Sequence, residues 1–101
     1  MQMLMLVFRT SLKERVHELL HRCDVNAFTE VNETVGYGQS GPAEGLAFYP
    51  GTNTVIMIAL DSDHAARVTK AVRTWCGEAV KHPGWEKPAL RVFTWQTEQI
   101  V

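Results

Sequence analysis

The stretch Val55-Ile-Met-Ile-Ala-Leu60 is an unbroken apolar block, too short for a core helix and rich in β-branched residues. Met3-Leu-Met-Leu-Val-Phe8 is a second apolar block of similar length. Short continuous runs of this kind are typical of strands that are buried on both faces. We therefore expect two central strands, and the other elements are placed relative to them.

A helical pattern follows each apolar block. Ser11 stands at a predicted N-cap position with Glu14 three residues later, a capping-box signature for a helix from Leu12 to about Arg22. The expected buried stripe of this helix is Leu12, Val16, Leu19, Leu20 and Cys23. Asp61 or Ser62 caps a second helix. Its buried stripe recurs at helical spacing: Ala65, Val68, Val72, Trp75, Cys76 and Ala79.

Two further strands are predicted from alternation. Positions 25 to 35 alternate between small or apolar and polar residues, which indicates a strand with one solvated face, and positions 90 to 97 alternate in the same way. Positions 36 to 52 hold five glycines and two prolines, so we expect a long loop over about 37–52. The segment KHPGWEKP at 81–88 is predicted to be a turn.

The predicted order is thus strand, helix, strand, strand, helix, strand. With right-handed crossovers this order gives an α+β fold of the ferredoxin-like βαββαβ type, a four-stranded antiparallel sheet with two helices on one face. Its first and third strands are central, which agrees with the two apolar blocks. The 101 residues predict one such domain over 1–101. Because two helices cover only one face, we expect another subunit to bury the second face.

Composition excludes several classes of function. Ten Lys and Arg against eleven Asp and Glu give a net charge of -1, so we expect no nucleic-acid partner. No apolar run approaches the roughly 20 residues of a membrane span, so we expect a cytoplasmic protein without direct membrane insertion. Cys23 and Cys76 lack CxxC spacing and are predicted to be free, buried thiols. Neither a nucleophile with a neighbouring base nor a carboxylate pair is evident, so no enzyme activity is predicted.

The segment Gly36-Tyr-Gly38-Gln-Ser-Gly41 matches GxGxxG, but it follows the second predicted strand and runs into a loop, which disfavours a dinucleotide-binding fold. Two interpretations stay open. The glycines allow left-handed turns at the base of the loop. Alternatively, consecutive N–H groups form a cradle for phosphate or carboxylate, with Gln39 adding a side-chain amide.

Taken together, the order of elements, the run Thr29-Glu30-Val31 ahead of GYGQSG and the long loop resemble the PII signalling proteins and their PII-like relatives. The resemblance covers the whole chain in architecture, and in residues it is specific around 29–41. It implies a homotrimer that binds a small effector, such as the adenine nucleotides ATP, ADP and AMP, in clefts between subunits, with no fixed cofactor. It also implies a regulatory role, such as nitrogen regulation, in which the loop engages a membrane transporter or an enzyme.

The resemblance further implies roles for individual residues. Gly36, Gly38 and Gln39 fit the GFGRQ-type sequence that leads into the family's loop, although the arginine is absent, and they are expected to bind ligand. The family's second glycine-rich loop is reduced here, which leaves Lys87 and Arg91 as its cationic ligand residues. Both are otherwise interpreted as solvated surface charges. The apolar side chains of the loop are expected to contact the partner: Tyr37, Leu46, Phe48 and Tyr49.

The alternative is a trimeric ferredoxin-like protein of metal binding or metal tolerance, whose architecture PII proteins resemble. His17 and His21 lie four residues apart on one side of the first predicted helix, a spacing that can hold a divalent metal. No third ligand has a matching spacing, so no metal ligands are assigned. Convergence of these histidines with His82 or the cysteines would favour this alternative.

Overall fold

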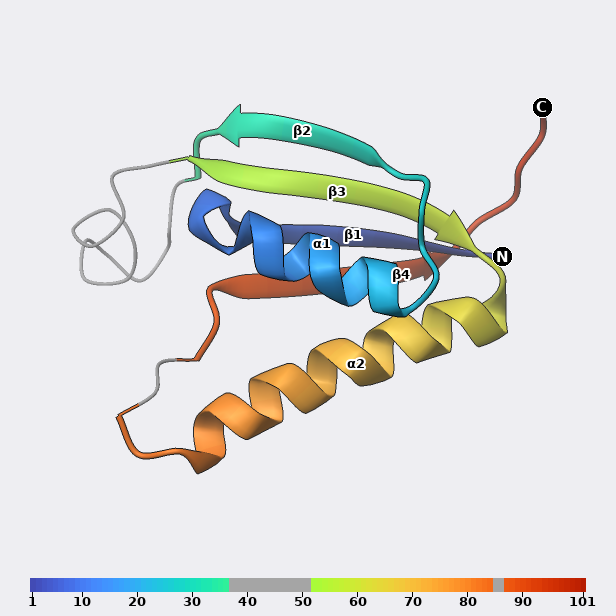
Figure 1. Cartoon of the computed structure of the whole chain (residues 1–101). Helices are drawn as coiled ribbons and strands as arrows, with labels where there is room; N and C mark the ends of the chain where they lie inside the picture. The colour runs from blue at the N-terminus through green and yellow to red at the C-terminus, as the bar shows by residue number, and fades with distance from the viewer. Residues whose placement is uncertain (37–51, 85–86) are drawn as a thin grey trace.

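A computed structural model describes residues 1–36, 52–84 and 87–101 of the chain, and its elements follow the predicted order (Figure 1). The strands are β1 (Gln2–Arg9), β2 (Thr29–Thr34), β3 (Asn53–Leu60) and β4 (Leu90–Gln96). The helices are α1 (Lys13–Arg22) and α2 (Ser62–Lys81), and a short 3-10 turn, η1 (Thr10–Leu12), precedes α1. No helix in these ranges is long and apolar enough to cross a membrane.

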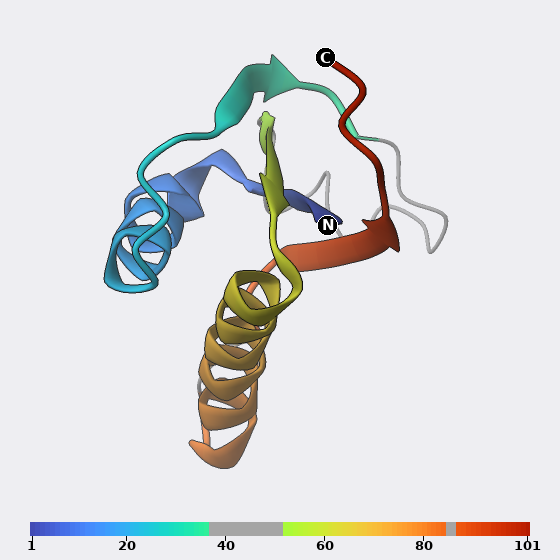
Figure 2. The same ribbon diagram turned by 90° about the vertical axis from the view of Figure 1, so that its right-hand side faces the viewer.

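The four strands form one antiparallel sheet in the order β2-β3-β1-β4. This order confirms the predicted ferredoxin-like α+β fold, with β1 and β3 at the centre. In the register of the sheet, Met5 of β1 lies between Met57 of β3 and Phe93 of β4. The two helices lie on one side of the sheet and diverge from each other (Figure 2).

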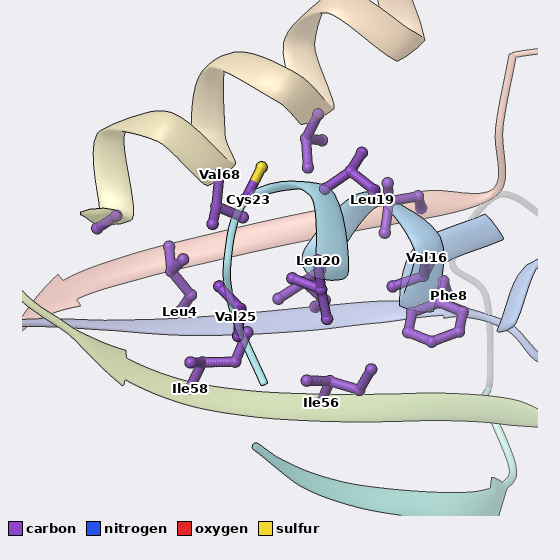
Figure 3. Close-up of a cluster of buried hydrophobic side chains, with 14 residues drawn as sticks. Leu4, Phe8, Val16, Leu19, Leu20, Cys23, Val25, Ile56, Ile58 and Val68 are labelled. Carbon is purple, nitrogen blue, oxygen red and sulfur yellow. The ribbon is translucent and has the colours of Figure 1, made fainter. Parts of the chain in front are cut away.

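The core lies between the sheet and the two helices (Figure 3). Every second side chain of β1 and β3 is buried there, together with most of the predicted stripes of α1 and α2. The fully buried large side chains include Leu4, Leu6, Phe8, Val16, Leu20, Ile56 and Val68. Cys23 is buried and Cys76 is half-buried, and both are free thiols. The prediction for Cys76 is therefore wrong in degree, because the helical stripe reaches the rim of the core at that residue.

The start of α1 differs from the prediction. Ser11 does not cap the helix, because Thr10–Leu12 form the 3-10 turn η1 and no side chain caps α1. The N–H and Oγ1 of Thr10 both donate to the carbonyl oxygen of Thr52, at 3.1 and 2.7 Å, which places the tight turn ahead of the helix. In α2 the cap is as predicted, since Asp61 Oδ1 accepts a 2.8 Å hydrogen bond from the N–H of His64.

β2 is shorter than the strand predicted over 25–35. Val25 is a core residue whose N–H donates to Leu20 O at 2.9 Å, after a turn in which Asp24 has a φ of 61°. The other end is irregular, because the pairing with β3 shifts register between Val31 and Thr34. The prediction is thus wrong at both ends. Alternation alone cannot distinguish a strand from an extended segment that enters the core.

The second face of the sheet is apolar, and no described residue covers it. The sequence predicts that β3 is buried on both faces, but within the chain only its helix-facing residues are buried. Met57, Phe93 and Trp95 are exposed by 36%, 48% and 41%. We call this surface the open face, and its apolar residues are Met3, Met5, Val7, Val31, Val55, Met57, Ala59, Phe93 and Trp95.

Candidate functional site

Four chain segments meet at the end of the sheet where β2 ends and β3 begins (Figure 1). β1 and β2 end there, and β3 and β4 begin there. The N–H of Arg9 donates to Ala89 O at 3.1 Å, and the N–H of Thr10 donates to Thr52 O at 3.1 Å. The end of β1 therefore joins the segment before β3 to the segment before β4.

Hydroxyl groups hold the base of the long loop. Thr54 is fully buried, and its Oγ1 lies 3.1 Å from Oγ1 of Thr10 and donates to Asn32 Oδ1 at 3.4 Å. The hydroxyl of Thr52 lies 3.1 Å from that of Thr10. Buried hydroxyls need such partners to offset their loss of water. Sequence reasoning missed this cluster, whose only signal is the presence of threonines on both sides of the loop.

Gly36 is the last described residue before the loop, and it lies against the start of β3. A Cβ atom built on Gly36 would lie 2.4 Å from Nδ2 of Asn53. Next to it, Thr34 Oγ1 donates to Asn53 O at 2.8 Å. Glycine therefore leaves room for the side-chain amide of Asn53 where the loop begins. This packing role stands beside the ligand role predicted for Gly36.

Lys87 and Arg91 lie at the same end of the sheet but on different sides of it. Arg91 pairs with Val7 in the register of β1 and β4, on the face that carries Phe93 and Trp95, as the alternation predicts. Lys87 lines a groove between α1 and α2 on the helix side. The chain thus offers one exposed cation to each side of the sheet near the loop.

The predicted ligand residues also belong to opposite edges of the sheet. Gly36 follows the edge strand β2, whereas Arg91 is in the edge strand β4. Three strand intervals of about 4.8 Å separate these edges by roughly 14 Å, which is farther than one phosphate group spans. The two halves of the predicted site would meet if the β2 edge of one copy lay beside the β4 edge of another.

The other predicted site residues lie outside the described residues, and their roles stay predictions. They are Gly38 and Gln39 of the ligand site, and Tyr37, Leu46, Phe48 and Tyr49 of the partner-binding loop.

A charged cluster ties β2 to α1 close to this end of the sheet. Glu30 Oε1 lies 2.5 Å from Nε2 of His17, and Oε2 accepts from Lys13 Nζ at 3.4 Å and from Asn32 Nδ2 at 3.1 Å. Burial raises the pKa of Glu30, but the hydrogen bonds from His17, Asn32 and Lys13 outweigh it and hold the pKa below the ordinary value of 4.5. The ring of His17 also packs on Phe28, with centroids 5.4 Å apart. Through these contacts, Glu30 attaches β2, the strand that precedes the loop, to α1.

The same contacts bear on the metal-binding alternative. His17 is engaged by Glu30, while His21 is exposed and His82 lies 3.9 Å from Glu78 at the far end of α2. Within residues 1–36, 52–84 and 87–101, no three His, Cys, Asp or Glu side chains are grouped so that they could hold a metal ion. The convergence of histidines and cysteines that this alternative needs is not found within the described chain.

The sheet order, with both helices on one face, defines a ferredoxin-like α+β fold. CPII, a nitrogen regulatory PII-like protein from Thiomonas intermedia K12 solved with ADP, AMP and bicarbonate, is similar at a TM-score of 0.62 and 18% identity, over 99% of this chain and 94% of CPII. Its apo form is similar at a TM-score of 0.59 and 14% identity, over 95% and 89% of the two chains. A PII-like signaling protein from Thermus thermophilus is similar at a TM-score of 0.61 and 13% identity, over 93% and 82%.

These likenesses confirm the predicted resemblance to PII-like proteins at the level of the fold. No protein-family model matches the sequence. No curated protein matches it significantly either. The residue roles implied by the resemblance therefore stay predictions.

Proposed function

We propose that this chain is a divergent PII-like regulatory protein whose homotrimer binds a small anionic effector, an adenine nucleotide, between subunits. The observation that carries the proposal is the division of the site between the two edges of one sheet. Gly36 and the base of the loop lie at the β2 edge, and Arg91 lies at the β4 edge of the same end. Such a site is complete only where two copies adjoin.

The open face supports the association that this site requires. It gathers large apolar side chains from all four strands, including Met5, Met57 and Phe93 in one row across the sheet. Burying such side chains is worth about 1.5–3 kcal/mol each. Apolar surfaces of this extent usually mark interfaces. A second and third copy that cover one another's open faces would bury them.

Within each cleft, we assign donor roles to Gly36, Gly38 and Gln39, and charge to Lys87 and Arg91. A phosphate group requires such partners because the loss of its water is costly. Ordering of the loop over about 37–52 on binding would change its contact with a partner, a transporter or an enzyme. The protein would act in the cytoplasm by binding and not by catalysis. The fold it shares with CPII, solved with ADP and AMP, is consistent with this role.

The test is calorimetric titration of the full chain with ATP, ADP and AMP. We expect saturable binding of an adenine nucleotide at one site per subunit. Gln39→Ala, Lys87→Ala and Arg91→Ala each remove a hydrogen bond to a charged group, worth about 1.5–3 kcal/mol, so affinity should fall by roughly 10- to 150-fold.

The matched control is Arg73→Ala, an exposed cation on α2 that lines neither the loop base nor the groove between the helices. We expect this variant to bind nucleotide as the unmodified chain does. Unchanged affinity in Gln39→Ala and Arg91→Ala would disprove the site. A folded trimer that binds no adenine nucleotide would disprove the effector class.

A further inference from the structure

A groove of about 1060 Å³ runs between α1 and α2, on the opposite side of the sheet from the open face. The two helices are joined at one end, where His64 Nε2 lies 2.5 Å from Cys23 O and Arg67 pairs with Asp24 at 3.1 Å. From that end they diverge, as Figures 1 and 2 show. The segment around Pro88 lines the groove near its open end.

The groove concentrates the basic residues of the chain. Six of the ten Lys and Arg line it, against two of the eleven Asp and Glu, although the chain as a whole has a net charge of -1. The cations come from four separate segments: Arg9, Arg15, Arg22, Arg67, Lys70 and Lys87. Because like charges repel, such a concentration favours an anionic occupant.

Several of these charges are available to an occupant. Among the described residues, no carboxylate lies within ion-pair distance of Arg22 or Lys70. One of the two carboxylates of the groove, Glu78, is already paired with Lys81 at 3.7 Å. The guanidinium of Arg15 lies over the ring of Trp75, 4.9 Å from its centroid, and so stays at the rim.

The floor of the groove is apolar. Leu12 and Leu19 of the α1 side face Ala71, Trp75 and Ala79 of α2 across it. Trp75 is only half-buried, so part of its ring surface is open to an occupant. An apolar floor between basic rims requires an occupant that is apolar along one side and acidic along its flanks.

The length of the groove indicates what size of occupant it fits. Its lining follows the whole of α1 and the thirteen residues from Arg67 to Ala79 of α2. At about 1.5 Å per residue, these helices run beside it for roughly 15 and 20 Å. That length matches a helix of about ten to twelve residues.

We propose that this groove binds an acidic, amphipathic helical segment of another protein. The segment places apolar side chains at i, i+3, i+4 and i+7 on the floor, and its Asp and Glu side chains meet the basic rims. Lys87 is the one groove residue that we also assign to the effector site, and the rest of the groove lies outside that site, so the inference goes beyond the proposed function. A partner would therefore have a docking surface in addition to the loop at 37–52.

The experiment selects peptides of about twelve residues from a random displayed library on the full-length protein. We expect the enriched peptides to be net acidic and apolar at helical spacing. A fluorescein-labelled copy of the best peptide is then titrated by fluorescence anisotropy. The double variant Arg22→Glu, Lys70→Glu should bind it at least about tenfold more weakly, since each removed ion pair is replaced by repulsion.

The matched control is Arg73→Glu, the same change on an exposed residue of α2 outside this groove, which should alter peptide affinity less than twofold. Enrichment of basic or neutral peptides, or equal affinity in the double variant, would overturn the proposal. Tighter binding of single-stranded DNA at the same residues would also overturn it in favour of a nucleic-acid surface. Arg22 and Lys70 are not in the effector site, so unchanged nucleotide binding in the double variant keeps the two proposals separable.

Discussion

Replacing Met57 with lysine tests the open face directly. Met57 pairs with Met5 and Thr29 in the register of the sheet, and its side chain is 36% exposed. Full burial of methionine is worth about 1.5–3 kcal/mol, so the exposed third is worth about 0.5–1 kcal/mol per copy when it is covered. In a trimer the loss occurs three times, about 1.5–3 kcal/mol in all. The association constant should then fall by roughly 10- to 150-fold.

The lysine charge adds to this loss, because an unpaired charge in an apolar interface is costly. The assay is sedimentation velocity over a range of micromolar concentrations. We expect the unmodified chain to sediment as a trimer and Met57→Lys to dissociate as it is diluted. The matched control is Val80→Lys on α2, a residue that is 71% exposed and lies off the open face, and it should stay trimeric. An unmodified chain that is monomeric throughout, or a Met57→Lys variant with unchanged mass, would refute the reasoning.

Three further substitutions test local features. Asp61→Ala removes the cap of α2 and should lower the free energy of unfolding by about 1 kcal/mol and the melting temperature by about 4–8 °C. Ser11→Ala removes no cap and should leave the melting temperature unchanged. Thermal denaturation followed by circular dichroism compares the two variants. Glu30→Gln should destabilise the chain near pH 7 and not at low pH. The pKa of Glu30 is lowered in the fold, so its stabilisation is present above about pH 4.5 and is lost as the pH falls through the folded pKa. Urea unfolding from pH 7 to pH 3 measures the difference in stability between the variant and the unmodified chain. A difference that stays constant over this range would contradict the prediction. Gly36→Ala should cost less than about 1.5 kcal/mol in urea unfolding, because the clashing atom is the end of the flexible Asn53 side chain, and a loss above about 3 kcal/mol would contradict this.

The fold was predictable because its signals are local. The apolar blocks at 3–8 and 55–60 became the two central strands, and the helical stripes around Val16 and Val68 became the core faces of α1 and α2. The errors lie at element ends. Ser11 does not cap α1, because it lies in the turn that the hydrogen bonds between Thr10 and Thr52 stabilise, and these two residues are far apart in the sequence. No local pattern contains that contact.

The candidate site was predictable in part. The alternation along β4 placed Arg91 on the face of Phe93 and Trp95, and the register agrees. The placement of Lys87 on the helix side was not predicted, because it follows a turn for which the sequence has no periodic signal. The roles of Gly38 and Gln39 remain predictions.

By itself, the amino-acid sequence determined which segments are strands and helices and which of their faces are apolar, since residues within a turn or a few positions of one another decide periodicity and capping. Only the tertiary structure decided which distant groups share a surface. It divided Gly36 and Arg91 between opposite edges of one sheet, and it gathered cations from four segments into one groove. Helix divergence and strand order produce these arrangements, and both arise from packing between residues that are remote in the chain.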